Sequence, residues 1–202
     1  MNKLIILIDN GHGIDTPGKR SPQWPDGSQL LEWEFTRDIA RRLSKLLAMR
    51  EIPYQLIVPE IEDISLKERC SRVNSAVHYN TKYCGRACLL ISIHANAGKG
   101  TGWECFTTKG DTLSDSVATL FYESAKAYFP GQKIRTDFSD GDADKEENFY
   151  ILQHTKCPAV LTENFFMDTE KDCKLLMQED FRQEIADMHL DAIVNLIKAH
   201  YS

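Results

Sequence analysis

The sequence predicts an α/β fold in a single domain, with a twisted, mostly parallel β-sheet flanked by helices on both faces. Two long apolar runs, 4–8 and 87–93, have the pattern of strands buried on both faces. Amphipathic segments separate such runs, and a helix between two strands favours parallel pairing. The length of 202 residues and the hydrophobic content of 42% are sufficient for one sizeable core.

The first strand, Leu4–Ile8, leads directly into Asp9-Asn10-Gly11-His12-Gly13. Two glycines allow a sharp turn and place His12 at the carboxyl end of the strand, where open α/β sheets bind ligands. Residues 14–30 are rich in Pro, Gly, Ser and Asp, so we expect a loop that covers or lines a site.

The remaining elements follow from periodicity and from capping and turn residues. A capping box at Ser65–Glu68 starts the second helix. In chain order we expect a helix over 31–49, a strand over 53–58, a helix over 65–78, strands over 87–98 and 102–108, a helix over 114–129, strands over 149–152 and 159–163, and helices over 169–177 and 180–199.

Composition excludes several classes of protein. A net charge of -6 argues against general binding of nucleic acid, which needs a basic face. No apolar run reaches the roughly 18 residues of a membrane span, and the start of the chain lacks a signal-peptide pattern. We therefore expect synthesis in the cytoplasm, one domain over 1–202 without a separate wall-binding domain, and six reduced cysteines.

Four residues stand where strands end or a helix begins. The run Ile91-Ser92-Ile93-His94 repeats the pattern of a buried strand that ends on a histidine, Glu32 lies in the first turn of a helix, and Glu163 ends the strand after Pro158. Each residue also has a structural interpretation: a turn for His12, the helix dipole for Glu32, and an ion pair at the sheet edge for Glu163.

Together, His12, Glu32, His94 and Glu163 offer two imidazoles and two carboxylates. Two imidazoles and one carboxylate around an open fourth position form the ligand set of hydrolytic zinc. Such zinc activates water and polarises a carbonyl, while a nearby glutamate that is not a ligand takes the water's proton. The set therefore indicates hydrolysis of an amide or an ester.

The motifs around these residues resemble those of the zinc-dependent N-acetylmuramoyl-L-alanine amidases of the third amidase type, in order and spacing over most of the chain. The resemblance implies a mixed sheet of about six strands, one Zn²⁺ held by His12, Glu32 and His94, and Glu163 as general base. It also implies the substrate, which is the bond between N-acetylmuramic acid and L-alanine of peptidoglycan. Asn96, in the Ser-Ile-His-Ala-Asn motif, is expected to contact this substrate.

Three positions depart from the family pattern. Asn10 stands where the family usually has proline, Phe165 where it commonly has glycine, and the region of Gln153 and His154 where it often has arginine. With Phe165 in place of glycine, the sequence does not determine the local conformation of the backbone. The change near His154 suggests different contacts with the stem peptide. We interpret His154 as a surface residue, with a role near the substrate as the alternative, and assign no role to His78, His189 or His200.

The polar stretch 131–147 is expected to be a mobile loop, and its aspartates a solvated face with at most weak attraction for calcium: Asp137, Asp140, Asp142 and Asp144.

Other functions remain open from sequence. The scaffold could hold muropeptide without cleaving it, or zinc could hydrolyse another amide. For the biological role, a phage or prophage lysin that acts on the cell wall after release fits better than a secreted autolysin, because no signal or wall-binding repeat is found.

Overall fold

A six-stranded sheet lies at the centre of the molecule, with the strand order β2-β1-β3-β6-β4-β5. The computed structural model describes residues 3–139 and 141–201. The strands are β1 (Leu4–Asn10), β2 (Tyr54–Leu56), β3 (Ala87–Asn96), β4 (Trp103–Thr107), β5 (Lys145–Glu146) and β6 (Ala159–Phe166).

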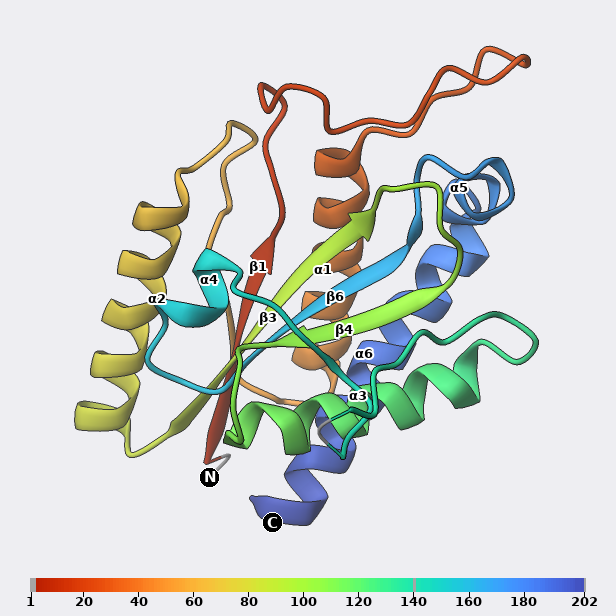
Figure 1. Cartoon of the computed structure of the whole chain (residues 1–202). Coiled ribbons are helices and arrows are strands. Elements are labelled where there is room, and N and C mark those ends of the chain that lie inside the picture. Colours follow the sequence, from red (N-terminus) through yellow and green to blue (C-terminus); the bar gives the residue numbers. More distant parts are fainter. Residues whose placement is uncertain (1–2, 140, 202) are drawn as a thin grey trace.

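Helices cover both faces of this sheet (Figure 1). They are α1 (Glu32–Met49), α2 (Leu66–Tyr79), α3 (Leu113–Tyr128), α4 (Tyr150–Gln153), α5 (Glu170–Leu176) and α6 (Glu179–His200), and α2 continues into the short π-helical turn η1 (Asn80–Cys84). The prediction of an α/β domain with a mixed, mostly parallel sheet is confirmed.

Side chains of each strand alternate between two hydrophobic clusters. In β1, Ile6 and Ile8 face α1, α3 and α6, whereas Ile5 and Leu7 face α2 and α4. Because both faces are covered, apolar residues fill every position of the run, as the sequence indicated.

The central strands β1, β3 and β6 are parallel, and β6 is antiparallel to β4. Parallel neighbours bring their carboxyl ends to one edge of the sheet. In the β3–β6 register, His94 stands opposite Glu163. The strands thus deliver both predicted residues to the same edge.

The prediction of a strand over 149–152 is wrong, since Phe149 caps a short helix, α4, and the other three residues belong to that helix. A short apolar run cannot be assigned by periodicity alone, and here Ile151 and Leu152 pack against the α2 side of the sheet. The sixth strand is instead β5, two residues of the stretch expected to be a loop, which pair with Phe106 and Thr107 of β4.

The six cysteines are free thiols, as expected. No helix in the described ranges is long and apolar enough to cross a bilayer.

Candidate metal centre

The turn after β1 is shaped to bring two imidazoles together. A Cβ atom on Gly11 would lie 2.2 Å from Cε1 of His94, so only glycine leaves room for this ring. His12 has a φ of 63°, a left-handed conformation that L residues rarely adopt. This conformation lets the rings of His12 and His94 approach edge to face, with 5.0 Å between centroids.

Two arginines hold the strained turn in place. Nη1 of Arg37 donates to the His12 carbonyl at 2.8 Å, and Nη2 of Arg69 donates to the same oxygen at 3.3 Å. Arg69 is almost fully buried and also pairs with Asp9 at 2.7 Å. Ser92 donates to the other oxygen of Asp9 at 2.6 Å. A buried polar network therefore holds the backbone of His12 in its strained conformation.

We expect Arg69→Ala to lower the free energy of unfolding by about 3–5 kcal/mol, because it leaves the buried Asp9 carboxylate without its cation. Arg72→Ala is the matched control on the same helix. Arg72 is half-exposed and pairs with Glu60 and Glu68, so its loss should cost at most about 1 kcal/mol. Urea unfolding of both variants measures the difference, and equal losses would contradict the assigned role of the network.

Glu32 begins α1 and lies between the two imidazoles. Its Oε1 is 3.4 Å from Nε2 of His12 and 3.1 Å from Nδ1 of His94. One potential ligand atom from each of the three residues lies within 4.8 Å of the others. The side chain of Glu32 is 1% exposed, whereas Glu34 in the same turn is exposed. The helix-dipole interpretation thus suits Glu34 but does not explain why Glu32 is buried.

The titration properties of the three residues depend on one another. Burial alone would raise the pKa of Glu32, but contacts with His12 and His94 hold it well below its usual range. Burial lowers the pKa of His12. Burial also acts to lower the pKa of His94, yet Glu32 and Glu163 raise it overall. Glu32 is therefore ionised and available as an anionic ligand.

Two buried polar atoms of this group have no hydrogen-bond partner among the described residues: Nε2 of His12 and Oε2 of Glu32. A buried polar atom left without a partner costs free energy. Lys19 approaches Oε2 of Glu32, but only to 3.9 Å. The three residues thus form an incomplete polar cluster that a cation would complete.

Glu163 lies on β6 next to this group. Burial raises its pKa to about 8, the charges of Glu32 and Glu104 contribute, and His94 opposes them. Oε2 of Glu163 is buried without a hydrogen-bond partner. The sheet-edge ion pair considered from sequence is not among the described salt bridges. Glu163 is a half-buried acid whose buried Oε2 is free to accept a proton.

Asn96 donates its side-chain amide to Glu104 on β4. Glu104 is 3% exposed and also pairs with Arg135 at 2.7 Å and with Lys145 at 2.8 Å. It stands opposite Glu163 in the β4–β6 register. Sequence reasoning missed Glu104, although a glutamate inside an apolar strand was a signal. The structure places Asn96 in this network, and its contact with substrate stays a prediction.

The stretch 14–30 extends past the carboxyl edge of the sheet as an arm that reaches toward α5 (Figure 1). Nε1 of Trp24 donates to Sγ of Cys173 at 3.2 Å, and Lys174 pairs with Asp26. The arm brings Lys19 close to Glu32. It therefore contributes to the surroundings of the cluster, as its length suggested.

The family departures at positions 165 and 10 have different structural outcomes. Phe165 has a φ of 63°, the conformation that favours glycine. Its fully buried ring contacts Phe129 and Phe181, with centroids 5.2 and 5.1 Å away. Aromatic packing thus offsets the backbone strain, and the chain keeps a glycine-like path. Asn10 is buried, and its carbonyl accepts from Arg69.

His189, to which the sequence assigned no role, is fully buried on α6. Its Nδ1 lies 2.7 Å from the Ile185 carbonyl, and its Nε2 lies 3.0 Å from Oγ1 of Thr162, the residue before Glu163. Burial lowers the pKa of His189 to about 4. The neutral imidazole therefore connects α6 to β6 at Thr162, one residue before Glu163.

This histidine should make folding sensitive to acid. Because its folded-state pKa lies below the unfolded value of 6.5, the unfolded state takes up the proton first. Stability should fall by up to about 3 kcal/mol as the pH decreases from about 6.5 to about 4. Urea unfolding as a function of pH should show this slope reduced in His189→Gln and retained in His78→Gln, which alters an exposed residue. An unchanged slope in His189→Gln would refute the assignment.

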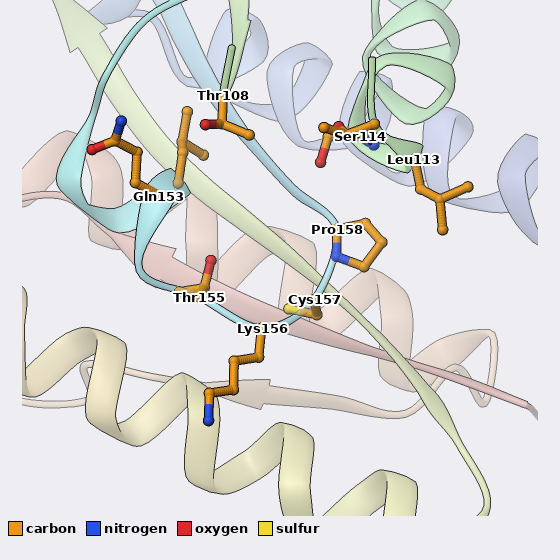
Figure 2. A pocket seen from close by; sticks show the side chains of 10 residues that line it. Thr108, Leu113, Ser114, Gln153, Thr155, Lys156, Cys157 and Pro158 are labelled. Carbon is orange, nitrogen blue, oxygen red and sulfur yellow. Dashed lines mark hydrogen bonds between the residues drawn. The ribbon is translucent and has the colours of Figure 1, made fainter. Parts of the chain in front are cut away.

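Two of the cavities lie at opposite edges of the sheet. A pocket of about 210 Å³ contains the two histidines of the cluster and is bordered by Asp63, Arg69 and Ile151. Another, of about 500 Å³, lies where β4 ends and β6 begins, and Gln153 lines it together with Thr108 and Lys156 (Figure 2). Gln153, in the region of 153 and 154 where the resemblance suggested a missing arginine, thus borders the second pocket.

His154 is exposed, in agreement with its interpretation as a surface residue. Its ring stacks on Tyr150, with centroids 3.8 Å apart. His78 and His200 are exposed on α2 and α6.

Comparison with known proteins gives a consistent result. A family model described as N-acetylmuramoyl-L-alanine amidase matches residues 6–195. A sporulation-specific N-acetylmuramoyl-L-alanine amidase of Bacillus subtilis is 30% identical over 192 residues, covering 93% of this chain and 66% of that protein. An endolysin of Bacillus phage SPP1 is 28% identical over 206 residues, covering 98% of this chain and 67% of the endolysin.

Among solved structures, an N-acetylmuramoyl-L-alanine amidase from Clostridium difficile 630 superposes with a TM-score of 0.77 at 23% identity, covering 99% of this chain and 100% of that one. At this identity the likeness concerns the fold. The chain spans about two thirds of the length of the curated relatives described above. The family match extends over nearly all of the chain, from β1 to α6. The chain therefore belongs to the N-acetylmuramoyl-L-alanine amidase family.

Proposed function

We propose that this chain hydrolyses the amide bond between N-acetylmuramic acid and L-alanine in peptidoglycan, with one zinc ion and Glu163 as general base. The observation that carries the proposal is the meeting of His12, Glu32 and His94 beside a fourth acid, Glu163, whose Oε2 is buried. Family membership supports the choice of substrate.

The three residues fit zinc by type and by spacing. Neighbouring ligand atoms of a tetrahedral zinc ion with bonds of about 2.0–2.1 Å lie roughly 3.3 Å apart. Oε1 of Glu32 is 3.4 Å and 3.1 Å from the imidazole nitrogens of His12 and His94. The unpartnered Nε2 of His12 and Oε2 of Glu32 are free to bind a cation. We infer that His12, Glu32 and His94 would hold the ion.

A bound zinc ion would lower the pKa of water and polarise the scissile carbonyl. Glu163 would take a proton from the attacking water through its free Oε2 and then give it to the leaving nitrogen. Its pKa of about 8 applies to the metal-free chain, and a cation nearby would favour the ionised form that a base requires. The half-buried position of Glu163, with Oε2 free of hydrogen bonds, thus suits both halves of the proton transfer.

Digestion of purified sacculi by the zinc-loaded protein, followed by mass analysis, tests the substrate. We expect free stem peptides that begin with L-alanine and glycan strands with intact N-acetylmuramic acid. Cleavage within the stem or loss of acetyl groups would assign a different amide, and binding without release would assign a muropeptide-binding module. For the biological role, similarity to a phage endolysin supports a lysin that acts on the cell wall.

A further inference from the structure

A second group of carboxylates lies away from the histidines. Asp115 of α3 meets Asp142 and Asp144 of the segment before β5, and one oxygen of each lies within 4.8 Å of the others. Asp115 and Asp142 are 27 positions apart in the sequence, so only the fold brings them together. Asp140 lies outside the described residues, and Asp137 is exposed.

Asp144 is not part of a solvated face, in contrast to the interpretation from sequence. It is 3% exposed, and its Oδ2 accepts from Oγ1 of Thr107 at 2.6 Å. Its Oδ1 is buried and lacks a hydrogen-bond partner, as does Oδ1 of Asp142. Two buried carboxylate oxygens that accept no hydrogen bond lower the stability of the fold, unless a cation or a proton neutralises their charge.

The surroundings supply no basic partner. None of the salt bridges described for residues 3–139 and 141–201 includes one of the three aspartates, and Lys145, next in sequence, is paired with Glu104. Burial, followed by the nearby carboxyl group of Asp142, raises the pKa of Asp144 to about 7. Around neutral pH the group therefore lacks compensation for its charge.

We propose that Asp115, Asp142 and Asp144 form a structural calcium site, distinct from the zinc site, that fastens the segment before β5 to the start of α3. Calcium prefers carboxylate oxygens at about 2.3–2.6 Å, so one ion joins oxygens up to roughly 5 Å apart, and the observed spacing meets this limit. Asp115 also accepts from the backbone of Thr112 in a capping box, and carboxylate oxygens have lone pairs for both contacts.

Calorimetric titration of the zinc-loaded protein with CaCl2 tests the site. We expect one Ca²⁺ per chain, lost in Asp144→Asn and in Asp142→Asn. Asp137→Asn is the matched control, because Asp137 is exposed in the same stretch, accepts from the Ser139 backbone and is not one of the three clustered aspartates. The control should bind as the wild type does, and Mg²⁺ should bind more weakly because it demands a tighter octahedral site.

Thermal unfolding gives a second readout that is independent of catalysis. At a Ca²⁺ concentration about 100 times Kd, the melting temperature of the wild type and of the control should rise by about 5 to 10 °C, and that of Asp144→Asn should not change. Absence of saturable binding in the wild type at millimolar Ca²⁺, or binding in Asp142→Asn and Asp144→Asn as tight as in the wild type, would overturn the proposal. Stabilisation by mild acid without cation binding would overturn it too, since a shared proton would then neutralise the pair.

Discussion

Glu163→Gln is expected to lower the rate of peptidoglycan hydrolysis by about 10²- to 10⁴-fold, because glutamine cannot accept a proton from the attacking water. Glutamine matches glutamate in size, and Oε2 of Glu163 makes no hydrogen bond that would be lost. Turnover of solubilised sacculi, measured for both proteins at equal zinc content, checks the result.

Two controls separate a role in chemistry from a role in folding. Zinc content should match that of the wild type, since Glu163 lies beside the proposed ligands and is not one of them. In the zinc-free protein, the variant should unfold at no lower temperature, because burial disfavours the ionised carboxylate that the substitution removes. Digestion by Glu163→Gln at the normal rate would disprove the role of general base.

The second large effect is expected from Glu32→Gln. Exchange of the anionic ligand for a neutral amide should weaken zinc binding at least about 100-fold. Loss of a residue that only hydrogen-bonds a metal ligand typically lowers metal affinity by about 10- to 100-fold, and loss of a ligand should cost more. Activity should fall in proportion to the zinc content. Glu34→Gln is the matched control, since Glu34 lies in the same helical turn and is exposed. Elemental analysis after dialysis against a weak chelator measures the difference.

The comparison within one helical turn also tests the alternative interpretation of Glu32. If this residue served mainly the helix dipole, the two substitutions would lower thermal stability alike and leave zinc bound. Equal zinc content in Glu32→Gln and Glu34→Gln would therefore contradict the ligand assignment.

The fold was predictable where burial fixes the pattern. The run Leu4–Ile8 is covered on both faces, so all its residues are apolar, and this pattern is typical of a strand in a parallel sheet. The run 149–152 was misassigned because four apolar residues suit a strand and a helical turn equally well. β5 could not be found, since two residues become a strand only through pairing with β4.

The residues that meet in the cluster were predictable individually, because a strand that ends on a histidine or glutamate is recognisable in the sequence, and their proposed roles stay predictions. The network around them was not predictable. In the sequence, His189 looks like any other residue of a helix. Its contact with Thr162 is visible only in the packed structure. Likewise, the meeting of Asp115 with Asp144 depends on tertiary structure rather than on local spacing.

The central claim is that one zinc ion binds between His12, Glu32 and His94. Crystallographic anomalous scattering at the zinc absorption edge tests this most directly. The account predicts a single strong peak in contact with the two imidazoles and the Glu32 carboxylate. A zinc-soaked crystal without a peak there, or with its principal peak among other side chains, would contradict it.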